Sequence, residues 1–437
     1  MNIHKLPADD HSCGWIEVLP QRRPVLSLSG DQRADWVILG AGYTGVAAAR
    51  RLAELCPNDR VVVVDAQRAG ESASGRNSGF MVDVSTPRYA VETGQDELYL
   101  RKYAVNTAAI ELLRKTVTDN GIECQWSQTG KYHGAADPAN TSELEAIAQF
   151  CQRLGFEHEV LDAKAVSQRL GVSYYQGAVF TPETVLVQPA ALSRGLALTL
   201  PESVSLYEKT PITGIDFGTT LRLHSPNGTI NAKRLILAAN GFLPGMGVLN
   251  SKLMPLTLTA SMTRVLEPDE RPESGSDDNW GVLSAHPTGA TVRYTKDHRV
   301  VIRNTSEFWP RLHMNSTQLN QRQHLHENGL KARFPGIKGS AIDYTWSGVT
   351  CVSLNGMPYF GALKDNVFAS GGYNGSGLAR GTMAGHLLVD YALGCDSELL
   401  RNVLDGPQPT WIPPRPFLDL GAHWKISQAR KGVGQDR

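Results

Sequence analysis

The chain lacks a net charge and a long hydrophobic run. Its 437 residues carry 43 Lys and Arg against 43 Asp and Glu, so no charge excess attracts nucleic acid or an anionic membrane surface. The longest apolar runs fall far short of the ~18 residues that a membrane-spanning helix needs. The first 34 residues contain no apolar core typical of a secretory signal. We therefore expect no nucleic-acid partner, no membrane span and a cytoplasmic protein.

Cysteine is scarce, and its spacing matches no metal site. The six cysteines stand at positions 13, 56, 124, 151, 351 and 395, and none forms a CxxC pair. Zinc and iron–sulfur centres use closely spaced Cys or His ligands. His324 and His326 do not share a helix face. We expect no metal, and scattered cysteines of this kind indicate reduced thiols in the cytoplasm.

A glycine-rich turn follows the first pattern of a buried strand. The apolar residues 36–39 lead into Gly40-Ala41-Gly42-Tyr43-Thr44-Gly45 and an alanine-rich helix pattern that stops at Cys56. The three glycines allow a tight turn, the approach of a pyrophosphate and close packing of helix on strand. A second strand, residues 61–64, ends in Asp65, whose carboxylate can accept hydrogen bonds from ribose hydroxyls. The pattern predicts a Rossmann-like dinucleotide site.

Two further polar, glycine-rich segments suit the same ligand. The first is Ala73-Ser74-Gly75-Arg76-Asn77-Ser78-Gly79, where small residues can lie along a pyrophosphate and ribityl chain and Arg76 can pair with a phosphate oxygen. The second is Gly371-Gly372-Tyr373-Asn374-Gly375-Ser376-Gly377, between a short strand and a helix. The N–H groups at such a helix start can bind electron density.

These motifs together resemble the D-amino-acid oxidase-like (DAO) family of FAD-dependent oxidoreductases, in particular its γ-glutamylputrescine oxidoreductase branch. That branch also carries an Ala-Ser-Gly-Arg-Asn run behind the βαβ unit. Residues 235–242 and the block that begins at Trp346 fit the same family. The resemblance extends from about residue 15 to about residue 394 and covers most of the chain.

The resemblance implies that FAD is the cofactor. It places the segment around residues 372–377 against the flavin ring and the ribityl chain, and the backbone near Ile212 against the adenine. In some relatives a cysteine binds the flavin covalently, but that position falls near Gly348 and not at Cys351, so we expect non-covalent FAD. The residues expected to hold it are Gly40, Gly42, Tyr43, Thr44, Gly45, Asp65, Ala73, Ser74, Arg76, Asn77, Ser78, Gly79, Ile212, Ala239, Gly241, Gly372, Gly375, Ser376 and Gly377.

The expected fold class is α/β with an α+β substrate part. Length and apolar content allow two or three domains. The resemblance implies a discontinuous, Rossmann-like FAD-binding domain and an antiparallel sheet that covers the flavin ring. We expect an N-terminal extension over residues 1–34, the FAD-binding domain over 35–90, 155–249 and 345–437, and the substrate domain over 91–154 and 250–344.

The source of electrons follows from a missing motif. Flavoproteins that draw electrons from NAD(P)H usually carry a second nucleotide-binding βαβ unit, and no such pattern stands in mid-chain. The resemblance implies that a small-molecule amine is the reductant: the C–N bond of a primary or secondary amine or amino acid is oxidised by hydride transfer to flavin N5, and the imine hydrolyses. The electron acceptor remains open between O2 and a quinone or another acceptor.

Candidates on the substrate side are Arg293, Tyr294 and Trp346, each of which can equally be a packed sheet residue. Arg303 stands where the family has a small residue, and its charge favours an anionic substrate group if it faces the cavity. Two alternatives stay open. An oxidase of a 2-hydroxy acid or alcohol would need a histidine near N5, for which His286 and His313 are candidates. A flavin-binding subunit without its own chemistry would lack open space over the flavin.

Overall fold

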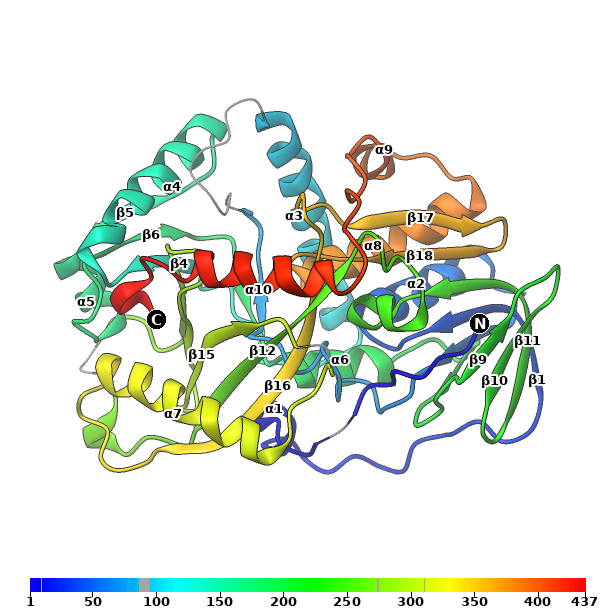
Figure 1. The fold of residues 1–437 in the computed structure, drawn as a ribbon, viewed down its shortest axis with the longest axis horizontal. Helices are drawn as coiled ribbons and strands as arrows, with labels where there is room; N and C mark the ends of the chain where they lie inside the picture. Colours follow the sequence, from blue (N-terminus) through cyan, green and yellow to red (C-terminus); the bar gives the residue numbers. More distant parts are fainter. Residues whose placement is uncertain (9, 86–94, 273–274, 310) are drawn as a thin grey trace.

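In a computed structural model the chain folds around two large sheets, which lie on the right and the left in Figure 1. The structure describes residues 1–8, 10–85, 95–272, 275–309 and 311–437. Its α-helices are α1 (Gly14–Glu17), α2 (Tyr43–Leu55), α3 (Asp96–Asp119), α4 (Thr141–Leu154), α5 (Ala163–Leu170), α6 (Pro189–Leu198), α7 (Ser316–Arg333), α8 (Gly377–Leu393), α9 (Glu398–Leu404) and α10 (Phe417–Ala429).

The first sheet has a parallel centre. In spatial order its strands are β17 (Tyr359–Lys364), β18 (Val367–Gly371), β11 (Gly228–Leu237), β1 (Gln32–Leu39), β2 (Val61–Val64) and β8 (Val204–Tyr207), with β10 (Leu221–Ser225) and β9 (Gly214–Asp216) attached to β11. The five strands from β18 to β8 are parallel, and the other three pair antiparallel. Since α2 connects the parallel strands β1 and β2, the expected Rossmann-like βαβ unit is confirmed.

The second sheet is mostly antiparallel. In spatial order its strands are β16 (Ile342–Val352), β12 (Met254–Thr263), β15 (Val300–Glu307), β14 (Thr291–Tyr294), β13 (Trp280–Ser284), β4 (Lys131–Ala135), β6 (Gly177–Thr181) and β5 (Glu159–Asp162). Only the pair β13 and β4 is parallel among these described strands. A short ribbon of β3 (Phe80–Met81) and β7 (Val185–Leu186) forms a separate pair. The α/β fold class with an antiparallel substrate part is confirmed.

The second sheet takes in more of the chain than the expected domain boundaries assign to it. Strands β5, β6 and most of β16 fall within 155–249 and 345–437, which we expected in the FAD-binding domain, yet they pair with the substrate sheet. Hydrogen bonds between strands distant in sequence decide this membership, and a local pattern does not carry that information. The expected boundary at residue 90 lies outside the described residues.

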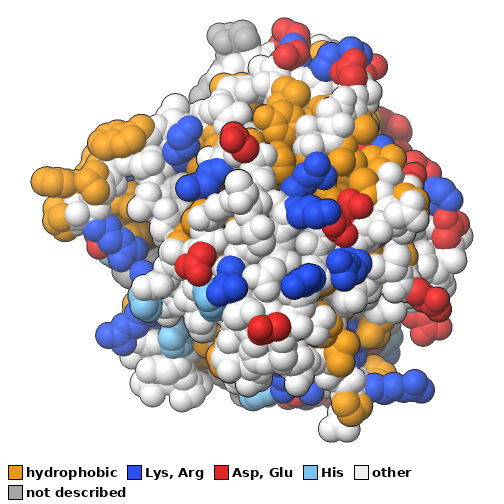
Figure 2. Space-filling model, turned by 90° about the vertical axis from the view of Figure 1, so that its right-hand side faces the viewer, with side chains coloured by type: hydrophobic (Ala, Val, Ile, Leu, Met, Phe, Trp, Pro, Cys, Tyr) orange, Lys and Arg blue, Asp and Glu red, His pale blue; other side chains and the backbone are white. Residues whose placement is uncertain are grey.

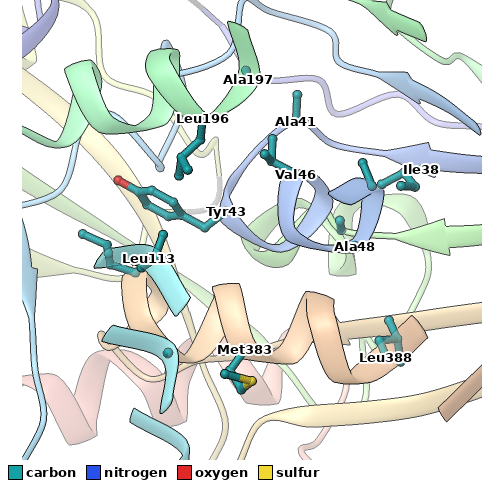
Figure 3. Packing of buried hydrophobic residues seen from close by; sticks show 14 of the residues in the cluster. Ile38, Ala41, Tyr43, Val46, Ala48, Leu113, Leu196, Ala197, Met383 and Leu388 are labelled. Atoms are coloured by element: carbon teal, nitrogen blue, oxygen red, sulfur yellow. The ribbon is translucent and has the colours of Figure 1, made fainter. Parts of the chain in front are cut away.

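The start of α2 is part of the main core. Along β1, Trp36 and Ile38 point to one face of the sheet, and Val37 and Leu39 point to the other. Figure 3 shows the first of these faces, where Tyr43 of α2 lies between Leu196 of α6 and Leu113 of α3. Helix α8 completes this layer with Met383, Leu387 and Leu388. The packing holds the first turn of α2 at the end of β1, where the candidate site begins.

Candidate active site

A cavity of about 1060 Å³ begins at the carboxyl ends of β1 and β2 and continues to the second sheet. Ligands of doubly wound α/β folds bind at the carboxyl ends of the parallel strands. The volume lies just above the usual range for pockets of drug-sized ligands, about 300–1,000 Å³. One end is lined by residues such as Leu39, Gly40 and Asp65, and the other by Leu283, Thr291 and Arg303. The cavity therefore joins the predicted nucleotide site to the predicted substrate sheet.

The turn between β1 and α2 requires bare glycines. Gly40 has φ +113°, which L-residues rarely adopt, and a Cβ on Gly45 would lie 1.8 Å from the carbonyl oxygen of Gly40. A Cβ on Gly42 would instead meet only the side chain of Ser74, at 3.8 Å, and Gly42 lines the cavity. The first N–H groups of a helix lack intrahelical partners. Gly40 and Gly45 thus shape the turn, and Gly42 leaves space beside the helix start for a phosphate.

Asp65 supports the same turn from the end of β2. Its Oδ2 accepts a hydrogen bond from the amide of Ala41 at 2.7 Å, and its Oδ1 accepts one from the amide of Gln67 at 2.9 Å. Burial raises the pKa of this carboxyl group to about 6, although the two amides lower it. Asp65 also lines the cavity. Each carboxylate oxygen can accept a further hydrogen bond, so a ribose contact remains our prediction for Asp65.

The segment 73–79 is held by hydrogen bonds from several elements. Tyr43 donates from its hydroxyl to the carbonyl of Ser74 at 2.8 Å, and Asn77 donates to the same carbonyl at 2.6 Å. The guanidinium of Arg76 donates to the carbonyls of Glu71 and Ser347 and pairs with Asp10 at 2.8 Å. Since Arg76 lines the cavity but binds these protein groups, its contact with a phosphate stays a prediction.

The third motif reaches the cavity from the C-terminal half. Tyr373 forms a hydroxyl hydrogen bond of 2.8 Å with Thr44 in the first turn of α2. The side-chain oxygen of Asn374 accepts from the amide of Ser353 at 3.0 Å, which ties the turn to the chain after β16. Helix α8 starts directly behind it, at Gly377. The motif thus lies beside the first turn of α2 in space, and its contact with the flavin ring and the ribityl chain stays a prediction.

Three of the predicted cofactor residues do not line the cavity: Gly45, Gly79 and Gly372. A Cβ on Gly79 would lie 2.2 Å from the carbonyl oxygen of Val187, and one on Gly372 would lie 2.5 Å from Leu253. These glycines permit close packing behind the site. The other sixteen predicted residues line the cavity. They come from six separate stretches of the chain: 40–44, 65, 73–78, 212, 239–241 and 375–377.

Of the three candidates on the substrate side, one lines the cavity and two do not. Trp346 lines the cavity and donates from its indole N–H to the carbonyl of Arg76 at 3.1 Å. Arg293 and Tyr294 are absent from the cavity lining. The side chain of Tyr294 lies on the other face of β14, where its hydroxyl meets His298 at 2.8 Å. A local strand pattern shows the alternation of faces but not which face borders the cavity.

Arg293 lies behind the segment 73–79. Its side chain is fully buried, donates to the carbonyls of Val187 at 2.5 Å and Ser78 at 3.2 Å, and stacks 5.3 Å from the ring of Trp15. Burial lowers the pKa of this guanidinium to about 9. Arg293 therefore positions the loop expected to hold the cofactor, and this placement does not support the expected contact with substrate.

The substrate end of the cavity contains charged residues that sequence reasoning missed. Besides Arg303, its lining includes Lys102, Lys131, Arg380 and Lys425, and among the described residues Glu143 is the one acid that lines this end. Lys131 is fully buried and pairs with Asp83 at 3.5 Å. His133 lies beside it, and burial lowers its pKa to about 3, so this imidazole is neutral near pH 7. No motif marks Lys131 and His133, because the pairing of β4 with β13 and β6 brings them to the cavity.

The residues present fit an FAD molecule. The open space at Gly42 and the start of α2 would receive the pyrophosphate. Asp65 would bind the ribose, and Thr210 and Ile212 would border the adenine. The segments 73–78, 239–241 and 375–377 would border the ribityl chain and the flavin. Cys351 is buried outside the cavity lining, and burial raises the pKa of its thiol to about 12. That environment fits a cofactor held without a thioether bond.

Comparison with known proteins agrees with this site. The sequence profile of the family described as FAD dependent oxidoreductase matches residues 35–391. The chain is 27% identical over 432 residues to gamma-glutamylputrescine oxidoreductase of Escherichia coli (strain K12), which covers 94% of this chain and 96% of that protein. The resemblance inferred from the motifs is confirmed.

Solved structures share the fold. Glycine oxidase from Geobacillus kaustophilus superposes with a TM-score of 0.70 at 18% identity, over 84% of this chain and 96% of that one. L-amino acid deaminase from Proteus myxofaciens gives 0.68 at 16% identity, over 86% and 94%. In the described part of this chain, no group of three or more His, Cys, Asp or Glu side chains could hold a metal ion.

Substitution of Gly42 by Val should abolish FAD binding, because the valine side chain would enter the space expected for the pyrophosphate. The protein should stay folded, since a Cβ at this position comes no closer than 3.8 Å to the side chain of Ser74. Substitution of Gly45 by Ala should lower the free energy of unfolding by about 1–3 kcal/mol, because its Cβ meets the main chain of Gly40. Flavin absorbance and thermal denaturation of both variants check this. Full flavin occupancy in Gly42→Val would contradict the phosphate site.

Substitution of Asp65 by Ala should weaken FAD binding by roughly tenfold to a hundredfold. A hydrogen bond to a charged group contributes about 1.5–3 kcal/mol, and ~1.4 kcal/mol corresponds to a factor of ten. The affinity can be measured by titrating apoprotein with FAD and following flavin fluorescence. Asp65→Asn is the matched control, because it keeps one carbonyl acceptor and should lose less affinity. If Asp65→Ala bound FAD with wild-type affinity, the predicted contact between Asp65 and the ribose would be contradicted.

Proposed function

The chain belongs to the family of FAD-dependent oxidoreductases, and we propose that it oxidises the C–N bond of a primary or secondary amine or of an amino acid. FAD, when bound, supplies the hydride acceptor at flavin N5, and the resulting imine would hydrolyse in water. The relative gamma-glutamylputrescine oxidoreductase supports an amine, and the fold neighbours glycine oxidase and L-amino acid deaminase support an amino acid. The protein's own task is to bind and orient the substrate.

The main support for the proposal is that the cavity extends beyond the part expected to hold the cofactor, into a space beside the second sheet. Beyond the segment 73–78, the cavity continues between β12, β13 and β14 and reaches α10. Trp346 borders both halves and holds the carbonyl of Arg76. This space could admit a small-molecule substrate. A flavin-binding subunit that catalyses no reaction would need no such space. The space therefore favours a catalytic role.

The charge at this end of the cavity favours a substrate with an anionic group. Arg303 on β15 lines the cavity and is held by the hydroxyl of Thr291 at 2.8 Å and the carbonyl of Gly289 at 3.3 Å. The pairing of Thr291 with Arg303 across the strands sets this position. A guanidinium is charged at every working pH, and a fixed orientation lets its charge attract and orient a carboxylate. We propose that Arg303 binds a carboxylate and so orients the carbon to be oxidised.

Oxidation of a 2-hydroxy acid or an alcohol is the second candidate. His286 lines the cavity, and its Nδ1 lies 3.2 Å from the hydroxyl of Thr288, so a histidine is present at the substrate end. His313, the other candidate, is exposed and absent from the lining. A neutral imidazole could accept the proton of a hydroxyl group. Lactate and choline should be tested beside the amines for this reason.

We also propose that the enzyme works in the cytoplasm. All six cysteines are free thiols, and Cys13, Cys124, Cys151 and Cys351 are buried. Reduced thiols are typical of the cytoplasm. In the part of the chain that the structure describes, no helix has the length and apolarity to cross a bilayer.

The purified protein should contain FAD that is released on denaturation, because the cavity holds no cysteine at the position expected for covalent attachment. Acid precipitation should leave the flavin in the supernatant, and chromatography should identify it as FAD. The intact chain should show the mass of the unmodified sequence. Flavin that stays with the precipitated polypeptide would contradict this expectation.

An amine that carries a carboxylate should reduce the flavin faster than an uncharged or dicationic amine of equal length. Arg303→Gln should raise KM for that substrate mainly, because a contact with the carboxylate binds ground state and transition state alike. Anaerobic bleaching of the flavin against amines, amino acids and N-alkyl amino acids checks both points. Arg311→Gln, an exposed arginine outside the cavity, is the control. The carboxylate contact would be contradicted if a simple diamine reduced the flavin fastest and Arg303→Gln had the same kinetic constants as the wild-type enzyme.

A further inference from the structure

The C-terminal segment crosses the mouth of the cavity as a strap. In Figure 1, α10 lies in front of the molecule between the two sheets. Before the helix, the amide of Ile412 donates to the carbonyl of Ser251 at 2.7 Å. After it, the carboxylate of Asp436 accepts from the amide of Ala136 at 2.7 Å and from Asn140 at 2.6 Å. The strap is thus fixed to the protein at both ends.

Helix α10 has two apolar faces, and the protein covers only one. Leu418, Ala422, Ile426 and Ala429 follow helical spacing and line the cavity. Phe417, Leu420 and Trp424 follow a second stripe of the helix and are 66–68% exposed, and Phe417 and Trp424 also border the cavity. Trp411, just before the helix, is 65% exposed. Large apolar side chains exposed together on one helix point to a contact surface. We call Trp411, Phe417, Leu420 and Trp424 the outer apolar patch.

The outer apolar patch lies among basic residues. Between residues 411 and 431 the chain carries Arg415, Lys425, Arg430 and Lys431 against Asp419 alone, although its charges balance overall. All four basic side chains are exposed; Lys425 also borders the cavity, and Arg415 pairs with Asp419 at 3.3 Å. In Figure 2, hydrophobic side chains with basic neighbours project at the left edge, the side that faces the viewer in Figure 1. Trp, Phe and Leu beside Lys and Arg are typical of helices that lie in a membrane interface.

We propose that the outer apolar patch binds the surface of an anionic phospholipid bilayer. The aromatic rings and Leu420 would enter the boundary between headgroups and acyl chains, and the basic residues would attract the anionic headgroups. This is a surface contact, consistent with the lack of a membrane-spanning helix in the described residues. In this orientation the mouth of the cavity, which α10 borders, faces the bilayer.

A second copy of the chain fits this patch less well. A contact related by a two-fold axis places the same patch on both partners, so the basic residues would repel each other. The 13 residues of α10 form a helix about 20 Å long. With a width of about 10 Å, its outer face offers about 200 Å², compared with about 800 Å² per partner in a standard protein interface. Charge and size therefore both favour lipid.

The test is sedimentation of the FAD-loaded protein with vesicles. Vesicles of phosphatidylcholine with phosphatidylglycerol should bind the protein, vesicles of phosphatidylcholine alone should bind at least tenfold more weakly, and 0.5 M salt should weaken the binding. The variant Leu420→Ser/Trp424→Ser should lose at least tenfold in affinity. Arg415→Glu/Lys431→Glu should lose the preference for anionic vesicles. Tryptophan fluorescence should shift to shorter wavelength on binding.

The control variant is Leu26→Ser/Leu198→Ser, whose side chains are 63% and 64% exposed outside the patch and should leave binding unchanged. Thermal denaturation and flavin absorbance show whether each variant is folded. Failure of the wild-type protein to bind either kind of vesicle would overturn the proposal. The proposal would also be overturned if Leu420→Ser/Trp424→Ser bound anionic vesicles as tightly as the wild-type protein. Sedimentation velocity that shows a dimer which this variant abolishes would assign the patch to a second copy instead.

Discussion

The contact between the first turn of α2 and the turn after β1 is the constraint on which the rest of the site depends. The Cα of Gly45 is packed so closely on the carbonyl of Gly40 that a Cβ would lie 1.8 Å from the oxygen. A second contact of this kind joins α8 to α2, because a Cβ on Gly385 would lie 2.0 Å from the carbonyl oxygen of Thr44. These contacts place the start of α2 at the cavity and bring residues from both halves of the chain to it.

The substrate sheet also supports the cofactor part of the cavity. Arg293 of β14 holds the carbonyls of Ser78 and Val187, and Trp346 of β16 holds the carbonyl of Arg76. Arg76 in turn donates to the carbonyl of Ser347. The segment 73–79 is therefore fixed from the side on which the substrate would lie. The loop that would border the flavin and the wall of the substrate space form one hydrogen-bonded unit, and this keeps their relative position constant.

The local elements could be predicted because each depends on residues close in sequence. The glycine turn, the alanine-rich helix and the strand that ends in Asp65 correspond to β1, α2 and β2. The substrate side could not be read in the same way. Arg293 lies behind the cofactor loop, and Lys131 and His133 reach the cavity only because β4 joins the second sheet.

The sequence by itself determined the family and its cofactor FAD, because a turn that binds a dinucleotide phosphate needs glycines at fixed spacing and such spacing is local. The membership of β5, β6 and β16 in the second sheet was decided only by tertiary structure, because strand pairing joins residues far apart in the chain. The aromatic and basic residues around α10 stand close together in the sequence. Only the fold shows that Phe417, Leu420 and Trp424 are exposed, because exposure depends on what the rest of the chain covers.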